Sequence, residues 1–171
     1  MNPQNVFSAL QYKLGASAPI EQDDIDAISS FTILWNIYED KFYEKSYNID
    51  DMLDKVEQGK INISDVDYYI KYFYNRYFVE EQGAGKFTKL KLSTKAGKAF
   101  INVKLLVERV LTTSSRKEHK IKAILSIIHR LRNNLFHGEK SMSNIHDEIK
   151  PVHIANKCLL DIIQSCDFTN P

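Results

Sequence analysis

Apolar side chains recur at intervals of three and four residues along most of this 171-residue chain, and that spacing places them on one face of an α-helix. The first such segment, 24–45, has a strongly aromatic face made of Phe31, Leu34, Trp35, Tyr38 and Phe42. Segments with the same period follow at about 48–58, 64–80, 95–112, 115–137 and 152–166. We therefore expect an all-α bundle without internal repeats.

Local signals mark where several of these helices should begin and end. Asn48, Ser64 and Ser115 are placed to cap helix starts, because a short polar side chain can accept a hydrogen bond from a free backbone amide there. Gly59 and Gly138 suit the left-handed conformation that often ends a helix.

Two places interrupt the helical pattern. The glycine-rich run that starts at Gln82 and the alternation of apolar residues and lysines after it predict a short irregular or hairpin insertion near 82–94. The same run resembles a phosphate-binding loop only superficially, because Glu80 replaces the first glycine and Phe87 replaces the magnesium-binding Ser or Thr. Pro151 is expected at the first position of the last helix, which needs no amide hydrogen.

The composition is typical of a globular domain with a core. Hydrophobic residues make up 43% and charged residues 26% of the chain, and its length favours a single domain over 1–171. No apolar stretch approaches the roughly 18 residues of a membrane span, and the first residues do not form a basic leader. We expect a soluble, cytoplasmic protein that makes no contact with a membrane.

The two cysteines are expected to be reduced. Cys158 and Cys166 are eight residues apart in one predicted helix, so their α-carbons should be roughly 12 Å apart, too far for a disulfide. No other cysteine completes a pair of metal ligands, and we expect neither a metal site nor a cofactor.

The net charge of +1 hides an uneven distribution. Residues 1–81 contain 15 acidic and 7 basic side chains, whereas residues 82–171 contain 7 acidic and 16 basic ones. The halves could neutralise each other by packing, or they could leave a basic face that binds phosphate. A lysine run with no acid among it could bind an RNA backbone or be a solvated face; its main members are Lys86, Lys89, Lys91, Lys95 and Lys98.

The main chemical signal lies at the carboxyl end of the helix expected over 115–137. His129, Asn133 and His137 fall along one side of that helix, and Arg132 lies within a partial turn of them. A histidine can move a proton near neutral pH, and a guanidinium can bind a phosphate with two hydrogen bonds and stabilise its negative charge. One solvent-facing side of the helix would then carry the groups that phosphodiester cleavage needs.

The run Arg132-Asn133-Asn134-Leu135-Phe136-His137 resembles the Arg, polar residue, three residues, His signature of the HEPN superfamily. The resemblance covers mainly 115–166, and Gly138 after the histidine is also familiar from that group. It implies a HEPN-like helical bundle. Many members of the superfamily are metal-independent endoribonucleases of toxin–antitoxin and anti-phage systems.

The resemblance also implies how such a site works. In a symmetric homodimer each subunit supplies Arg132 and His137. The ribose 2′-hydroxyl attacks the neighbouring phosphorus, His137 acts as general acid or base, Arg132 stabilises the phosphorane, and the products carry 2′,3′-cyclic phosphate and 5′-hydroxyl ends. Asn133 could orient the imidazole of His137. Glu139 stands where members paired with nucleotidyltransferase antitoxins usually have a Tyr, which argues against that kind of antitoxin.

Three further side chains are candidates for supporting the pair. Arg130 also fits the permitted spacing to the histidine, but Leu131 follows it, which favours a solvated or phosphate-contacting role. Glu39 lies at the edge of the aromatic face of 24–45, and acidic residues on an earlier helix assist the site in some HEPN-like proteins; the alternative is an exposed carboxylate. His129 either supports the site or is an ordinary half-buried helix residue.

Two other functions remain open from the sequence. The first is a non-catalytic HEPN-like module that binds RNA or a protein of a defence or stress system. The second is an antitoxin-like regulator whose acidic amino-terminal half binds a basic partner.

Overall fold

The computed structural model describes residues 21–44, 47–93, 102–136 and 145–165, except for the side chains of 145–148. Over these residues the chain is all-α, as expected. Its elements are α2 (Gln22–Tyr43), α3 (Ile49–Glu57), α4 (Val66–Tyr74), the π-helical turn η1 (Asn75–Val79), α5 (Gly83–Lys89), α6 (Val103–Thr112), α7 (Lys117–Phe136) and α8 (Ile145–Ser165). None of these described helices is long and apolar enough to cross a membrane.

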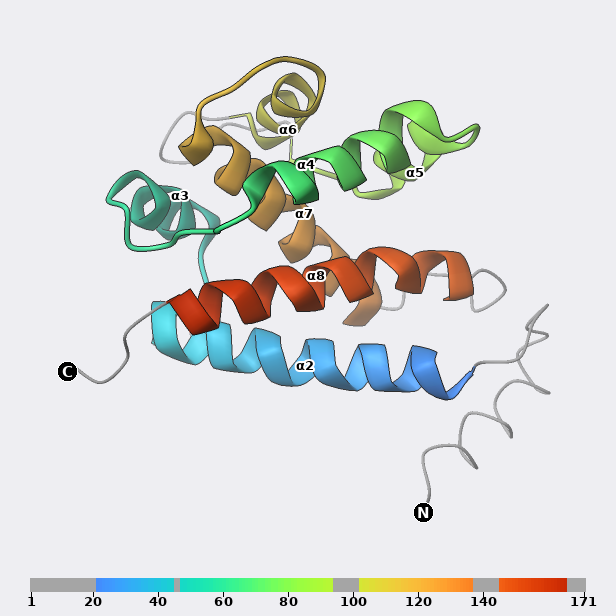
Figure 1. Ribbon diagram of the computed structural model, residues 1–171, viewed down its shortest axis with the longest axis horizontal. Helices are drawn as coiled ribbons and strands as arrows, with labels where there is room; N and C mark the ends of the chain where they lie inside the picture. Colours follow the sequence, from blue (N-terminus) through green and yellow to red (C-terminus); the bar gives the residue numbers. More distant parts are fainter. Residues whose placement is uncertain (1–20, 45–46, 94–101, 137–144, 166–171) are drawn as a thin grey trace.

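The helices are arranged around α7. In Figure 1, α2 and α8 lie side by side and run in the same direction, while α7 crosses behind them at a steep angle. On its other side α7 packs against α3, α4 and α6, and α5 packs against η1. Elements from both halves of the sequence therefore surround one central helix.

The middle of α7 is buried on all sides. Every residue from Ile121 to Ile128 is buried, which is the pattern of a helix enclosed by others. Within this stretch the ammonium group of Lys122 pairs with the carboxylate of Glu57 on α3. Burial decreases toward the carboxyl end, where Arg132 is half-buried and Phe136 is 46% exposed. The last turns of α7 therefore bring polar side chains from the core to the surface.

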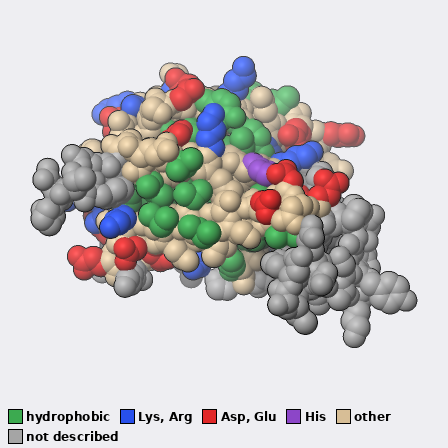
Figure 2. Space-filling view, turned by 60° about the horizontal axis from the view of Figure 1, so that its bottom comes forward, with side chains coloured by type: hydrophobic (Ala, Val, Ile, Leu, Met, Phe, Trp, Pro, Cys, Tyr) green, Lys and Arg blue, Asp and Glu red, His purple; other side chains and the backbone are tan. Residues whose placement is uncertain are grey.

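The aromatic face of α2 is confirmed. Phe31, Trp35 and Tyr38 are buried, and Asn156 of α8 donates a hydrogen bond to the Ala27 carbonyl over 2.8 Å. Figure 2 shows the outer side of this layer, where apolar side chains gather at the surface. The large apolar residues exposed on α2 and α8 are Ile33, Ile37 and Leu160.

The expectation of a loop or hairpin near 82–94 is wrong for its first half, because residues 83–89 form α5. A Cβ atom added to Gly83 would lie 2.7 Å from the carbonyl carbon of Tyr77, so glycine permits α5 to pack closely on η1. Phe87 is buried with its ring centre 5.7 Å from that of Tyr77. Tertiary packing thus outweighs the low helix propensity of two glycines.

Other helix ends are partly as expected. The Asn48 side chain caps α3 by accepting from the amide of Asp50 over 2.8 Å, and Gly59 has a positive φ of 71°. Asp65, not Ser64, caps α4. The helix expected to continue to Glu80 changes to the π-helical turn after α4.

The two long carboxyl-terminal helices begin elsewhere than expected. α7 starts at Lys117, so Ser115 lies one position too early to be its cap. Pro151 is buried inside α8 rather than first in it, and α8 packs against α2 along its length, which stabilises the helix despite the missing amide hydrogen. Cys158 is buried and forms no disulfide with a described residue, whereas Gly138 and Cys166 lie outside the described residues.

Candidate functional site

Arg132, the described member of the predicted pair, lies where α7 emerges from the core. Its guanidinium carbon is 5.9 Å from the ring centre of Trp35 on α2 and 5.7 Å from that of Phe136 on its own helix. Two aromatic neighbours restrict a planar cation, because it is attracted to the face of each ring. His137 lies outside the described residues.

A chain of hydrogen bonds links Arg132 to His129. Arg132 Nη1 donates to Asn133 Oδ1 over 3.1 Å, and Asn133 Nδ2 is 3.0 Å from His129 Nε2. A guanidinium can only donate, so the amide oxygen of Asn133 must face Arg132 and its nitrogen must face His129. The imidazole Nε2 is therefore the acceptor, and the ring proton is on Nδ1.

His129 is held inside an aromatic cluster. Its ring stacks on Trp35 at 6.0 Å with an angle of 20° between the planes, and it lies 4.5 Å from the ring centre of Tyr47. Burial, followed by the charges of Arg130 and Arg132, lowers the pKa of His129 to about 4. The imidazole is therefore neutral at pH 7, and the expected solvent-facing side of α7 is wrong at this position.

Glu39 supports the cluster through Trp35. One carboxylate oxygen accepts from the Trp35 indole nitrogen over 3.0 Å, and the other accepts from the backbone amide of Tyr47 over 3.2 Å. Glu39 is half-buried, so it is not the freely exposed carboxylate of the alternative reading. Among the described residues, Glu39 forms no hydrogen bond or ion pair with Arg132; it binds Trp35, whose ring lies beside the Arg132 guanidinium. A contact between Glu39 and His137 stays a prediction.

Buried polar atoms of this cluster lack partners. Tyr47 Oη, His129 Nδ1 and Arg132 Nε are all buried, and none has a hydrogen-bond partner among the described residues. Burial also raises the pKa of Tyr47, so its hydroxyl stays protonated at neutral pH. Buried polar groups are normally paired, which makes three unpaired atoms around one arginine unusual. We call this group the Arg132 cluster; its members are Trp35, Glu39, Tyr47, His129, Arg132, Asn133 and Phe136.

Arg130 is half-buried and forms a separate contact. Its Nε donates to the Leu90 carbonyl over 2.8 Å, and its Nη2 donates to Asn134 Oδ1 over 3.3 Å. Asn134 in turn donates to the Lys89 carbonyl over 3.1 Å. This half-buried side chain holds the segment after α5 against α7, and a phosphate contact by Arg130 stays a prediction.

That contact brings part of the predicted lysine run close to the end of α7. Lys89 and Lys91 are exposed on the segment held by Arg130. Lys86 is half-buried and pairs with Glu80 over 2.7 Å. Lys95 and Lys98 lie outside the described residues. Arg130 and Asn134 are each two residues from Arg132 and therefore point to the opposite side of α7, so RNA binding by these lysines stays a prediction.

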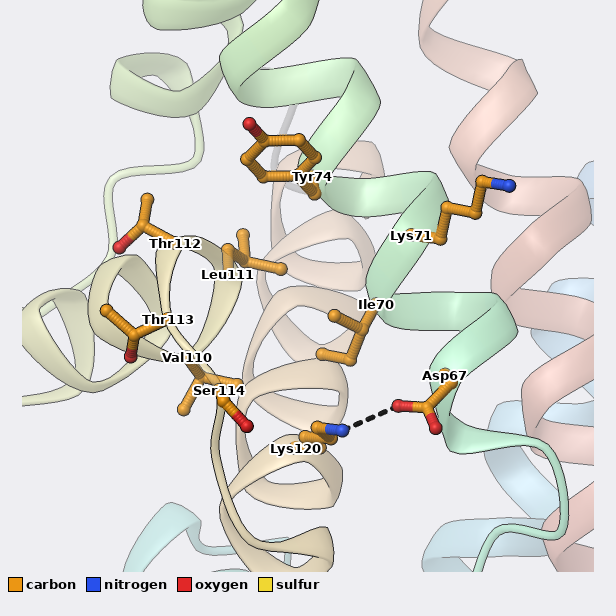
Figure 3. A pocket seen from close by; sticks show the side chains of 10 residues that line it. All are labelled: Asp67, Ile70, Lys71, Tyr74, Val110, Leu111, Thr112, Thr113, Ser114 and Lys120. Atoms are coloured by element: carbon orange, nitrogen blue, oxygen red, sulfur yellow. Dashed lines mark hydrogen bonds and ion pairs between the residues drawn. The ribbon is translucent and has the colours of Figure 1, made fainter.

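A pocket of about 340 Å³ lies at the other end of α7, between α4, α6 and the start of α7 (Figure 3). Apolar side chains such as Ile70 and Leu111 line it, and Lys120 closes one side by pairing with Asp67 over 2.6 Å. Twelve residues of helix separate Lys120 from Arg132, which is roughly 18 Å along the axis. The pocket is therefore not part of the Arg132 cluster.

Sequence reasoning assigned Trp35 only to the aromatic face of its helix, and it did not single out Tyr47. One signal was available: Trp35 and Glu39 are four residues apart on one helix, the spacing at which side chains meet. Nothing in the sequence could show that α2 brings this pair to the end of α7. Among the described residues, no three His, Cys, Asp or Glu side chains form a group that could hold a metal ion.

Comparison with known proteins gives no relative: no protein family, no curated protein and no solved structure matches the chain. The functional argument therefore depends on the side chains and their geometry.

Proposed function

We propose that the chain is a metal-independent endoribonuclease of the HEPN type, in which Arg132 and His137 act on one phosphodiester. The observation that supports this most strongly is the environment of Arg132. Its guanidinium carbon lies 5.9 Å from the ring centre of Trp35 and 5.7 Å from that of Phe136, and the side chain is half-buried where α7 reaches the surface. A guanidinium that is oriented by two rings and lies near the surface is suited to binding a phosphate.

The proposed reaction uses the 2′-hydroxyl of the substrate as nucleophile. The 2′-oxygen bonds to the adjacent phosphorus as its proton passes to a base, and the bond to the 5′-oxygen breaks as that oxygen gains a proton. His137 carries these protons, and Arg132 stabilises the charge on the phosphorane. The products are a 2′,3′-cyclic phosphate and a 5′-hydroxyl.

The Arg132 cluster supports different roles for His129 and His137. His129 is neutral at pH 7 because its pKa is lowered to about 4, and its Nε2 already faces Asn133. It is therefore poorly suited to exchanging protons near neutrality. In this proposal His129 and Asn133 position Arg132, and His137 moves the proton.

The proposal extends to the assembly and its setting. The active form is a homodimer in which two copies of Arg132 and His137 face one substrate. The substrate is cytoplasmic RNA, and the protein acts in a toxin–antitoxin, anti-phage or stress system, where an antitoxin or another defence protein controls it.

A cleavage assay with matched variants tests the proposal. Purified protein is incubated with RNA in the presence of EDTA, beside Arg132→Ala and His137→Ala. We expect cleavage by the wild type and a loss of at least about 100-fold in each variant, the scale on which one acid–base or charge-stabilising group contributes. Arg109→Ala and His119→Ala remove exposed side chains of the same types and should keep full activity.

The main alternative is a non-catalytic module that binds RNA. The exposed Lys89 and Lys91 beside the end of α7 favour it as much as they favour the nuclease, because phosphate binding needs no histidine. Salt-sensitive RNA binding without cleavage in the same assay would support the module and reject the nuclease.

A further inference from the structure

Phe136 is the last residue of α7 and the neighbour of His137 in the chain. Its side chain is 46% exposed, although the other large apolar side chains of α7 are buried or half-buried. The guanidinium carbon of Arg132 lies 5.7 Å from its ring centre. An exposed aromatic ring therefore lies next to the cation that we propose binds the scissile phosphate.

Single-stranded RNA presents a matching pair of groups. Each phosphate is joined through a ribose to a base with an apolar, stackable face, and bases stack on aromatic side chains in proteins that bind single strands. A cation beside an aromatic ring can therefore engage the phosphate and the base of one nucleotide together. The sequence also has no Asp or Glu from 119 to 138, so α7 carries no acid here that would repel the backbone.

No other exposed aromatic ring of the described residues combines a neighbouring cation with a place at the end of α7. Tyr74 and Phe78 stack on each other at 6.1 Å with an angle of 14° between the rings. Tyr68 has a cation nearby, since Lys157 Nζ lies 4.1 Å from its ring centre. Tyr68 is in α4 and Lys157 is in α8, so this pair is not at the end of α7.

We infer that the exposed ring of Phe136 is a stacking platform for the base of a nucleotide whose phosphate binds Arg132. The inference rests on the proposed function for its ligand class, which is single-stranded RNA. It assigns to this site an affinity for bases in general, because every base has a stackable face.

The test is an equilibrium binding cycle with a backbone that cannot be cleaved. The ligands are a 2′-O-methyl RNA hexanucleotide and the same sugar-phosphate backbone without bases, and the proteins are the wild type and Phe136→Leu. Stacking on one aromatic side chain changes affinity by about five- to 150-fold. We expect Phe136→Leu to weaken binding of the base-bearing ligand by that factor beyond any weakening of the abasic ligand, whose only contact at this site is the phosphate with Arg132.

Two further variants separate stacking from a general loss of structure. Phe136→Trp should restore binding of the base-bearing ligand. Phe78→Leu removes a ring of similar exposure, 38% against 46%, and should bind both ligands as the wild type does. Equal weakening for both ligands would overturn the inference, as would no measurable binding or no effect of Phe136→Leu.

The binding cycle is independent of the cleavage assay. Base-dependent binding that requires Phe136, in a protein that cleaves no RNA, would keep the stacking platform and reject the nuclease. If the protein cleaves RNA but Phe136→Leu does not change RNA binding, the nuclease is supported and the stacking platform is rejected.

Discussion

At the scale of single residues, Arg132 determines the hydrogen bonds of its neighbours. A guanidinium has no acceptor, so it fixes the orientation of the Asn133 amide and, through it, the proton position on His129. The imidazole is enclosed by Trp35 and Tyr47, and a charge there would be buried beside two arginines. His129 is therefore a neutral ring that stacks on Trp35 and accepts a hydrogen bond from Asn133.

A buried neutral histidine makes stability depend on pH. The pKa of His129 is about 4 in the folded protein and near 6.5 when unfolded, so the unfolded chain binds the proton more readily. The neutral imidazole therefore contributes fully to the free energy of unfolding above pH 6.5, and this contribution declines as the pH falls toward 4. We expect a loss of about 2 kcal/mol in unfolding free energy between pH 8 and pH 5, as an order of magnitude.

Urea denaturation at the two pH values measures this contribution. The loss should shrink in His129→Gln, which cannot be protonated, and should persist in His119→Gln, which alters an exposed histidine of the same helix. The charges that lower the pKa of this ring are those of Arg130 and Arg132 on α7, and the carboxylate of Glu39 on α2 accepts a hydrogen bond from Trp35, on which the ring stacks. An unchanged pH dependence in His129→Gln would show that the imidazole does not titrate in this range.

At the scale of elements, periodicity predicted the long helices, and tertiary contacts decided the rest. The aromatic face of α2 and the apolar face of α7 follow from local spacing, because each helix buries a continuous stripe. α5 could not be predicted, since its stability depends on the close approach of Gly83 to Tyr77. The burial of His129 was missed for the same reason: its own helix does not reveal that α2 covers it.

The two glycines of α5 should respond to alanine in opposite directions. A Cβ on Gly83 would meet backbone atoms of Tyr77 at 2.7 Å, whereas a Cβ on Gly85 would have no neighbour within 4 Å. Gly83→Ala should destabilise the protein by about 1–3 kcal/mol through steric overlap. Gly85→Ala should stabilise it by about 0.5–1 kcal/mol, because alanine loses less backbone entropy in a helix.

Thermal unfolding of both variants beside the wild type measures the two effects. If the variants shift the midpoint in the same direction, the packing of α5 on η1 described above is incorrect.

At the scale of the whole molecule, part of the charge asymmetry is neutralised inside one chain. Lys122 pairs with Glu57 and Lys120 pairs with Asp67, and each pair joins the basic carboxyl-terminal half to the acidic amino-terminal half. Both pairs involve the amino-terminal part of α7. Arg132 and the exposed Lys89 lie toward its other end, where the proposed RNA site needs positive charge.

A subunit-mixing experiment tests the proposed composite site. Arg132→Ala and His137→Ala are each expected to be inactive as homodimers. Unfolding and refolding them together should produce mixed dimers that retain one arginine and one histidine at the shared site, and part of the cleavage activity should return. Mixed dimers identified by differently tagged subunits but lacking any activity would contradict a site shared in this way.

The chemical ends of the cleaved RNA test the central proposal most directly. Mass spectrometry of the products formed in EDTA should show 2′,3′-cyclic phosphates and 5′-hydroxyls, and an RNA with one 2′-deoxy nucleotide at the cleaved position should stay intact there. Both results follow if the neighbouring 2′-hydroxyl attacks a phosphate bound by Arg132 while His137 transfers the proton. Products with 5′-phosphate ends, cleavage at the 2′-deoxy position, or intact RNA would contradict the proposal.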